Sequence, residues 1–133
     1  MDKLDREIPL CNLDDLEEQQ AIELTIDDRR LFAIRQDNQL HAYWNICPHL
    51  GVPLNWAPDK FLDLDNALIQ CSSHGALFHI DSGECIAGPC TGQHLQPVTL
   101  RTAEKDYFVV ADQPLPAAPL NLREQALADL EDR

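Results

Sequence analysis

The chain has 133 residues, with 23 Asp and Glu against 10 Lys and Arg, which gives a formal net charge of −13. A chain of this length can bury one hydrophobic core, so we expect a single domain over residues 1–133. Nucleic acids and anionic membranes bind basic surfaces, and the strong acidity therefore argues against both as partners.

Runs of alternating apolar and polar residues predict short β-strands in the first third of the chain. The expected strands cover residues 7–11, 21–26, 31–36 and 39–45. Between the first two strands, Asn12 to Asp15 has the composition of a turn or of one helical turn. Asp37-Asn38 is a typical two-residue hairpin turn.

The second half of the chain continues this pattern. We expect further strands over residues 67–70, 76–80, 95–102 and 107–111. The segments Asp81-Ser82-Gly83 and Glu104-Lys105-Asp106 are the turns that follow the second and third of these strands. Regularly spaced short strands with turn signals predict an all-β sandwich or barrel of antiparallel sheets.

Two cysteine–histidine motifs follow expected strands. The first is Cys47-Pro48-His49-Leu50-Gly51 and the second is Cys71-Ser72-Ser73-His74-Gly75, with 21 residues between His49 and Cys71. Each motif offers one thiolate and one imidazole, and each ends on a glycine that can adopt positive φ in a tight loop. We therefore expect two loops that approach one metal group from opposite sides.

Three interpretations of this residue set are open. A dinuclear iron–sulfur centre takes two thiolates on one iron and two imidazoles on the other. A structural zinc site also uses two Cys and two His, but its like ligands usually stand together in the sequence. A disulfide between Cys47 and Cys71 would leave both histidines and both glycines without a role. The one-Cys, one-His composition of each loop favours the iron–sulfur centre.

The pattern C-x-H-x-G followed by C-x-x-H-G resembles the Rieske ferredoxin family, over about residues 7–111. The resemblance implies a Rieske-type iron–sulfur fold of antiparallel sheets, with a small cluster-binding subdomain over about residues 44–89. It also implies that one [2Fe–2S] cluster per chain is bound by the four motif residues Cys47, His49, Cys71 and His74. In this family a Gly-Pro loop covers the cluster, a role that falls here on Gly88-Pro89.

Departures from the respiratory-chain Rieske subunits indicate a low reduction potential. Those subunits carry two further cysteines that bridge the cluster loops, where this chain has Val52 and Ser73. They also carry a serine and a tyrosine that donate hydrogen bonds toward the cluster, where this chain has Ala76 and Phe78. Such donors stabilise the reduced state, so their absence lowers the potential. The chain therefore resembles the low-potential ferredoxin branch.

The remaining cysteines and histidines have simpler interpretations. The histidines outside the motifs lack a spacing partner, and we expect surface or core positions for them: His41, His79 and His94. The other cysteines are expected to be small buried hydrophobic residues, two of which could also lie beside the cluster: Cys11, and the pair Cys85 and Cys90.

Two segments extend beyond the minimal pattern. Residues 54–62 contain Trp56 and Phe61, which we expect to pack beneath the cluster loops, with presentation to a partner as the alternative. A linker and a short helix are expected over about residues 112–133. The linker is proline-rich, and the helix is predicted to begin at Asn121, which has the composition of an N-cap, and to pack back onto the sheet.

We expect a cytoplasmic protein. The apolar runs are far shorter than the ~20 residues that a membrane span needs, and the charged segment Met1 to Glu7 is not followed by the apolar run of a signal peptide. Five cysteines, an odd number, fit a reducing compartment better than a disulfide framework.

The resemblance implies an electron carrier between a reductase and a terminal oxidoreductase such as a ring-hydroxylating oxygenase. The alternatives are a small subunit of a larger complex, resembling the nitrite reductase small subunit, and a zinc-stabilised binding module. We expect no catalytic residues in the chain, because it has neither a dinucleotide fingerprint nor a second iron site. An acidic surface would steer such a carrier toward basic faces of its redox partners.

Overall fold

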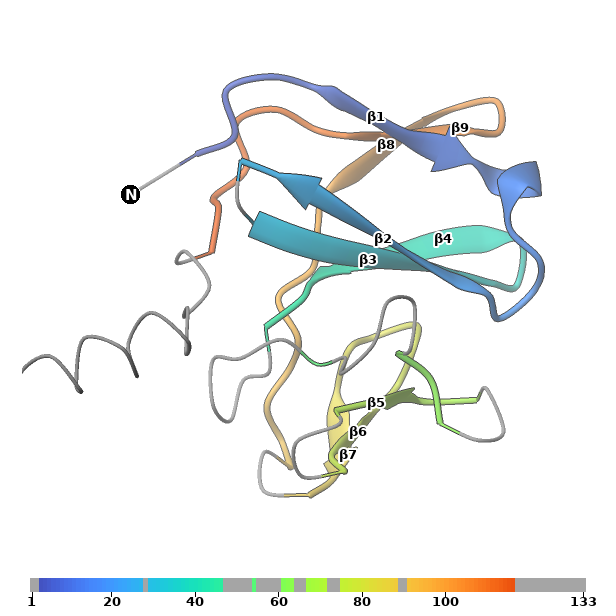
Figure 1. Ribbon diagram of the computed structural model, residues 1–133, viewed down its shortest axis with the longest axis vertical. Coiled ribbons are helices and arrows are strands. Elements are labelled where there is room, and N and C mark those ends of the chain that lie inside the picture. Colours follow the sequence, from blue (N-terminus) through green and yellow to red (C-terminus); the bar gives the residue numbers. More distant parts are fainter. Residues whose placement is uncertain are drawn as a thin grey trace, which may run out of the picture.

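Three antiparallel sheets of three strands each lie one above another and make up the fold (Figure 1). The computed structural model describes residues 3–27, 29–46, 54, 61–63, 67–71, 75–88 and 91–116. Within these residues the regular structure is nine strands and one short 3-10 turn. The expected all-β class with antiparallel sheets is therefore confirmed.

The upper sheet has the strand order β1-β9-β8 and joins the two ends of the described chain. Its strands are β1 (Ile8–Asn12), β8 (Leu100–Ala103) and β9 (Asp106–Val109). After β1, residues Leu13–Asp15 form a 3-10 turn that Asn12 caps, because its side chain accepts a hydrogen bond from the Asp14 N–H. The helical turn expected at this place is thus confirmed.

The central sheet has the strand order β2-β3-β4. Its strands are β2 (Ala21–Ile26), β3 (Arg29–Gln36) and β4 (Gln39–Trp44). Asp37 and Asn38 turn between the last two with φ of 54° and 61°, the double positive φ of a type I′ hairpin turn. Residues 31–34 of β3 are all buried, because this strand lies in the middle layer and meets a core on each face.

The lower sheet is built from three very short strands and carries the second cysteine–histidine motif. They are β5 (Ile69–Gln70), β6 (Leu77–Phe78) and β7 (Cys85–Ala87), in that order across the sheet. No strand was predicted over residues 85–87. Because only three residues pair there, the alternating pattern that identifies longer strands does not develop.

Two large buried clusters join the layers, and a third, smaller one gathers Leu13, Leu16 and Leu40. The lower core lies between the central and lower sheets, and the upper core lies between the central and upper sheets. Alternate residues of β3 divide between them, since Phe32 and Ile34 belong to the lower core and Leu31 and Ala33 to the upper. Phe61, expected beneath the ligand loops, is fully buried in the lower core and stacks on Phe32 at 4.4 Å between ring centroids.

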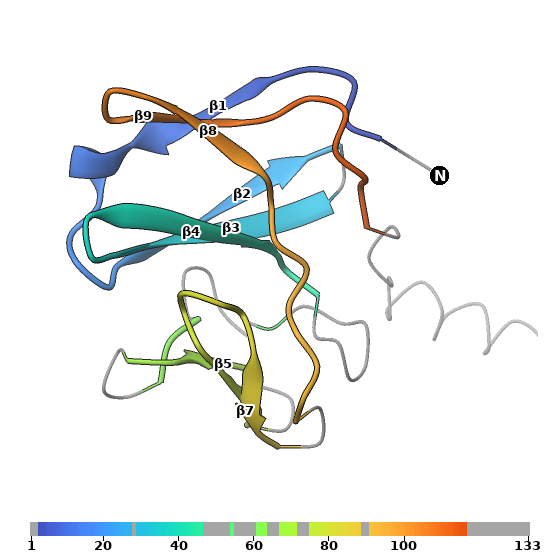
Figure 2. The same cartoon turned by 180° about the vertical axis from the view of Figure 1, so that it is seen from behind.

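The strand expected over residues 95–102 begins only at Leu100. Figure 2 shows the preceding segment climbing from the lower sheet past β4 to the upper sheet. It pairs with each layer in passing, through isolated bridges from His94 to Glu84 and from Pro97 to Tyr43. Pro97 has no N–H to donate to a strand ladder. The segment also passes from the lower sheet to the upper sheet, so it cannot pair with a single sheet along its whole length.

Residues 112–116 pack against the upper core instead of leaving the domain. Asp112 donates its N–H to the Leu4 carbonyl, and Leu4 donates to the Gln113 carbonyl. Leu115 contacts the upper core and Pro116 is buried. The helix predicted to begin at Asn121 lies outside the described residues. No helix in the described part of the chain has the length and apolar character that a membrane crossing requires.

Tyr43 fastens the turn of the lower sheet to the central sheet. Its hydroxyl donates to the Ile80 carbonyl at 2.6 Å. Gly83, at a φ of +72°, lies against the ring so closely that an added Cβ would be 2.7 Å from the tyrosine Cε1. Burial, together with the nearby charge of Asp81, raises the pKa of Tyr43 to about 12. The turn is therefore held by a neutral, buried phenol.

Replacement of Tyr43 by Phe should lower the free energy of unfolding at pH 7 by about 1 kcal/mol, because the Ile80 carbonyl loses its donor. The folded pKa of about 12 exceeds the ordinary value of 10.0, so the unfolded state ionises first and wild-type stability falls as the pH rises from 10 to 12. That fall should be shallower in Y43F. Denaturant titrations between pH 7 and 12 measure both effects.

Tyr107→Phe is the matched control, because its hydroxyl makes no hydrogen bond to the described residues. It should leave the neutral-pH stability within about 0.5 kcal/mol of wild type. Equal losses in the two variants would show that the Tyr43 hydroxyl does not hold the turn.

Candidate metal centre

The second motif begins where β5 ends, at a buried cysteine. Cys71 is fully buried and is a free thiol. Its N–H donates to the Ala76 carbonyl at 2.9 Å, and its carbonyl accepts the N–H of Gly75 at 2.9 Å. Gly75 has a φ of +69°, which a residue with a side chain adopts only with strain. These bonds hold Cys71 beside Gly75 and Ala76, from which the chain enters β6.

The end of β7 lies directly on the residue that follows this motif. Gly88 has a φ of +100°, and an added Cβ there would be 2.8 Å from the Cα of Ala76. The Gly88 carbonyl accepts two hydrogen bonds from Thr91, at 2.7 Å from its hydroxyl and at 3.3 Å from its N–H. The segment between Gly88 and Thr91 therefore begins and ends beside the second motif. Pro89 and Cys90 lie outside the described residues.

The ends of the first motif's segment are also held in place. Trp44 is the last residue of β4, and Asn45 follows it in a buried position. The Asn45 side-chain oxygen accepts the N–H of Leu54 at 2.7 Å. A residue before the first motif is therefore in direct contact with a residue after it. In the sequence, Asn45 stands at the end of an expected strand, and no role in the site was predicted for it. A polar residue beside a ligand motif is a signal that its side chain supports the motif when it is buried.

Of the four predicted ligands, the described part of the chain includes Cys71, while Cys47, His49 and His74 lie outside it. The described residues do show where the two motifs start and end. The lower core includes Leu54, after the first motif, Cys71, at the start of the second, and Ala76, directly after the second. Residues that adjoin the two motifs therefore belong to one buried cluster, as expected for motifs that share a metal group.

The other cysteines differ in burial. Burial and the charge of Asp15 raise the pKa of Cys11 to about 11, so this half-buried thiol on β1 stays protonated at neutral pH. Cys85 is buried in the lower core together with Cys71, and its thiol donates to the Ala87 carbonyl at 3.2 Å. Among the described residues, no group of three or more His, Cys, Asp or Glu gathers to hold a metal ion.

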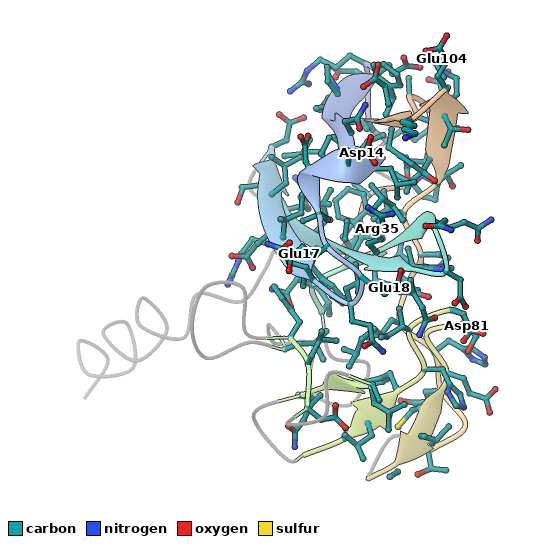
Figure 3. The ribbon with its side chains drawn as sticks, turned by 90° about the vertical axis from the view of Figure 1, so that its right-hand side faces the viewer. Asp14, Glu17, Glu18, Arg35, Asp81 and Glu104 are labelled. Atoms are coloured by element: carbon teal, nitrogen blue, oxygen red, sulfur yellow. The ribbon has the colours of Figure 1, made fainter. Side chains whose placement is uncertain are left out.

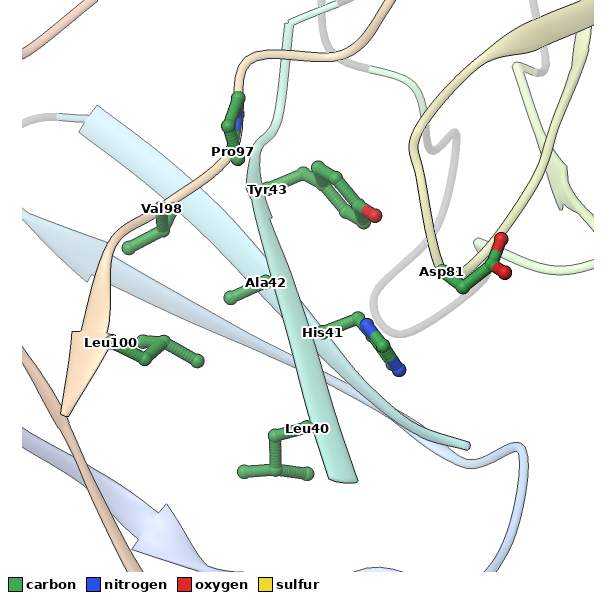
Figure 4. Close-up of a pocket in the computed structure, with 8 residues that line it drawn as sticks. All are labelled: Leu40, His41, Ala42, Tyr43, Asp81, Pro97, Val98 and Leu100. Atoms are coloured by element: carbon green, nitrogen blue, oxygen red, sulfur yellow. The ribbon is translucent and has the colours of Figure 1, made fainter. Parts of the chain in front are cut away.

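The remaining histidines stand on the surface or beside a groove. His79 and His94 are exposed, and the Nε2 of His94 is 4.0 Å from a Glu84 carboxylate oxygen. His41 is half-buried on β4 and faces a hollow of about 220 Å³ between this strand and the turn at Asp81 (Figure 4). Tyr43 and Val98 also line the hollow.

The surface is acidic over all three layers. Figure 3 shows Asp14 near the upper sheet, Glu17 and Glu18 at the central sheet, and Asp81 at the turn of the lower sheet. All four side chains are exposed. A cation on the same side, Arg35, donates to the Leu16 carbonyl at 2.9 Å and lies 3.9 Å from an Asp14 carboxylate oxygen, so it offsets part of the charge at Asp14.

Three antiparallel sheets, with a lower core that holds the start of one thiolate–imidazole motif and a residue just beyond the other, match the architecture of a Rieske-type iron–sulfur protein. The family model for the Rieske [2Fe–2S] domain matches residues 6–107, and the chain belongs to this family. The ferredoxin component of the alkene monooxygenase system from Xanthobacter autotrophicus is 28% identical over 111 residues, covering 82% of this chain and 84% of that protein.

A second relative is much longer. Apoptosis-inducing factor 3 from Homo sapiens is 30% identical over 78 residues, which is 59% of this chain but only 12% of that protein. The chain thus corresponds to a small part of this relative's length. The same figures hold for the protein from Mus musculus.

Solved structures share the fold. The ferredoxin of carbazole 1,9a-dioxygenase from Nocardioides aromaticivorans IC177 superposes with a TM-score of 0.60 at 19% identity, over 79% of this chain and 99% of that one. The terminal oxygenase of carbazole 1,9a-dioxygenase from Novosphingobium sp. KA1 superposes with a TM-score of 0.65 at 21% identity, over 86% of this chain and 32% of that one.

Family membership identifies the cofactor as one [2Fe–2S] cluster per chain. The described residues fit this group. Cys71 offers a buried thiol that is not consumed in a disulfide, and glycines at positions 75 and 88 keep side chains out of the adjoining loops. Soft thiolate ligands suit iron–sulfur clusters.

The two positions that lack hydroxyl donors lie in the lower core beside Cys71. Ala76 is 1% exposed and Phe78 is fully buried, where it pairs with Ile69 and Cys85 across the sheet. Ala76 directly follows the loop of the second motif, and neither side chain can donate a hydrogen bond toward the cluster. The sequence therefore still predicts a low reduction potential for the cluster, and the two residues on which this prediction depends are buried next to the site.

The reduction potential should lie near the bottom of the Rieske range, around −150 mV, and far from its upper end at about +300 mV. In the double variant A76S/F78Y, each added hydroxyl that reaches the cluster should stabilise the reduced state by on the order of 1 kcal/mol. This corresponds to tens of millivolts per hydroxyl for a one-electron couple. Protein-film voltammetry measures both proteins. A wild-type potential above zero, or no upward shift in a folded variant, would contradict this account.

Proposed function

We propose that this chain is an electron carrier that passes single electrons between a reductase and a terminal oxidoreductase such as a ring-hydroxylating oxygenase. The observation that supports the proposal is the match to the Rieske domain, together with the lower core that joins Leu54, just after the first motif, to Cys71, the start of the second. We assign the cluster to Cys47 and Cys71 on one iron and to His49 and His74 on the other. The bound cluster supplies a centre that accepts and releases one electron.

The protein's own part is to hold this centre at the end of a rigid scaffold. The ligand loops start and end on strands or on buried residues, and the lower core beneath them excludes water from one side. An electron carrier gains from such rigidity, because little of its structure has to rearrange when the charge changes. In the described residues, the chain contributes a scaffold and a surface, and we propose no catalytic residue.

The relatives support this assignment. The similarity to the alkene monooxygenase ferredoxin extends over most of that protein and most of this chain. A chain in a complex of reduced oxygenase and oxidised ferredoxin in carbazole 1,9a-dioxygenase has the same fold, with a TM-score of 0.63. A second candidate, a small subunit of a larger oxidoreductase resembling the nitrite reductase small subunit, is favoured by the match to a short part of apoptosis-inducing factor 3. A zinc-stabilised binding module is the third.

The organisation of the chain is part of the proposal. We propose that residues 1–133 form one domain, that residues 44–89 are its cluster-binding subdomain, and that residues 112–133 are a C-terminal linker and helix. We also propose a cytoplasmic location. The odd number of cysteines and the free thiol of Cys11 support it, because thiols persist in reducing compartments.

The metal content tests the proposed function. The protein purified without oxygen should be red-brown and contain two irons and two acid-labile sulfides per chain, because thiolates and imidazoles divide between two irons in this family. Cys71→Ser should abolish or severely reduce the iron content, since a serine oxygen is a poor substitute for a soft thiolate. Iron and sulfide assays with visible absorption measure this.

Cys11→Ser is the matched control and should keep both irons, because Cys11 lies on β1 of the upper sheet. A colourless wild-type protein with one zinc per chain would favour the zinc module over the carrier. Full iron content in C71S would remove Cys71 from the ligand set.

The acidic surface generates a kinetic prediction. If negative charge steers this carrier toward basic faces of its partners, the bimolecular rate of electron transfer should fall as the ionic strength rises beyond ~0.1 M, where the Debye length is ~10 Å. Stopped-flow mixing with the physiological reductase or oxygenase at several salt concentrations measures this rate. A rate that is constant or that increases with salt would show that the charge serves solubility alone.

A further inference from the structure

A chain of polar contacts connects β2 and β3 to the segment that carries the first motif. Arg30 donates from Nε and Nη2 to one carboxylate oxygen of Glu23, at 3.2 and 2.6 Å. The Asn45 Nδ2 donates to the same Glu23 oxygen at 2.9 Å. The Asn45 Oδ1 then accepts the Leu54 N–H at 2.7 Å. The contacts run from a surface arginine to a fully buried backbone amide.

The contact between Asn45 and Leu54 joins the two ends of the segment that carries the first motif. Asn45 stands two residues before Cys47, and Leu54 stands three residues after Gly51. The Asn45 N–H also donates to the Arg30 carbonyl at 2.8 Å, so the backbone at the first end is fixed to β3. The second end is fixed by Leu54, which is fully buried in the lower core. One side chain thus connects both ends of the segment to the same point on the central sheet.

An amide can make both contacts of Asn45, whereas a carboxylate cannot. The Glu23 carboxylate accepts hydrogen bonds and the Leu54 N–H donates one, so the residue between them must donate on one side and accept on the other. The orientation of the amide group follows from these partners. Asn45 is 2% exposed, and a buried side chain that lost either partner would leave a polar group unsatisfied.

We infer that Asn45 is a positioning residue for the cluster: its amide closes the first ligand loop onto Glu23 and keeps that loop at the distance from the second loop that the cluster needs. The inference rests on the proposed ligand set. A cluster shared by two loops is lost when one loop moves away, because the iron then becomes accessible to water and to competing ligands. The Glu23–Asn45–Leu54 contacts should therefore control how fast the cluster is released, beyond their effect on folding.

The test measures release of the cluster to an iron chelator at 25 °C and pH 8, followed by the loss of visible absorption, in parallel with the thermal unfolding midpoint. Asn45→Asp retains the acceptor for Leu54 but replaces the donor with a second carboxylate beside Glu23, and it should release the cluster at least about tenfold faster. Asn45→Leu removes both contacts and should do the same. Glu23→Gln keeps an acceptor oxygen and should change the rate less than about threefold.

Combining the substitutions separates positioning from packing. In N45D/E23Q the like-charge repulsion is gone, so release should be slower than in N45D alone. In N45L/E23Q there is no repulsion to remove, so release should match N45L. Gln113→Leu is the matched control, because Gln113 is also a buried amide, which donates to the Val110 carbonyl at 2.7 Å far from the ligand motifs. It should lower the unfolding midpoint without accelerating release.

The inference would be overturned if N45D and N45L released the cluster at a rate within twofold of wild type. It would also be overturned if their release rates rose only in proportion to the lower unfolding midpoint, as in Q113L. Neither result would contradict the proposed function, because the protein would still bind its cluster. If the Asn45 variants do not load a cluster, Glu23→Ala decides, because it leaves the Asn45–Leu54 contact in place. It should release the cluster several-fold faster, and an unchanged rate would overturn the inference. A wild-type protein without iron and sulfide would overturn the proposed function and the inference with it.

Discussion

The packing of the lower sheet on the central sheet is the constraint on which the metal centre depends. Strands of two or three residues cannot hold a sheet together by their own ladders, so β5, β6 and β7 take their position from the lower core. Phe61 stacks on Phe32, and Tyr43 reaches across to the Ile80 carbonyl. The described ends of the loops that leave this sheet are fixed by their packing against the lower core and Ala76. The proposed cluster site is thereby attached to a framework that has its own, separate upper core.

Positive-φ glycines and buried polar groups adapt this framework to the loops. Gly83 allows the Tyr43 ring to lie against the turn, and Gly88 allows β7 to approach Ala76. Asn45 supplies a donor and an acceptor where the first loop departs and returns. Gly88 and Asn45 adjoin segments that carry the ligand motifs, and Gly83 lies in the turn that Tyr43 fastens. The glycines are suited to their places by the missing Cβ, and Asn45 by its amide. The support of the site is thus distributed over all the elements that adjoin it.

The match to proteins of very different length agrees with this arrangement. In the alkene monooxygenase ferredoxin the similarity covers most of the protein, whereas in apoptosis-inducing factor 3 it covers 12% of the length. A domain whose cofactor loops, support and framework are all contained within about a hundred residues can serve as a separate carrier or as a part of a larger chain. Which partner it serves is decided by its surface, and here that surface is strongly acidic.

Local patterns were sufficient to predict much of this protein. The bounds of β2 and the turn at Asp37-Asn38 follow from residues that are close in sequence, and the family follows from the spacing of two motifs. What sequence alone left undecided depends on distant contacts. β7 exists because it pairs with β6, the run before Leu100 is divided because it crosses three layers, and Asn45 matters because Glu23 and Leu54 meet there. Such contacts have no period along the chain, so only the tertiary structure could reveal them.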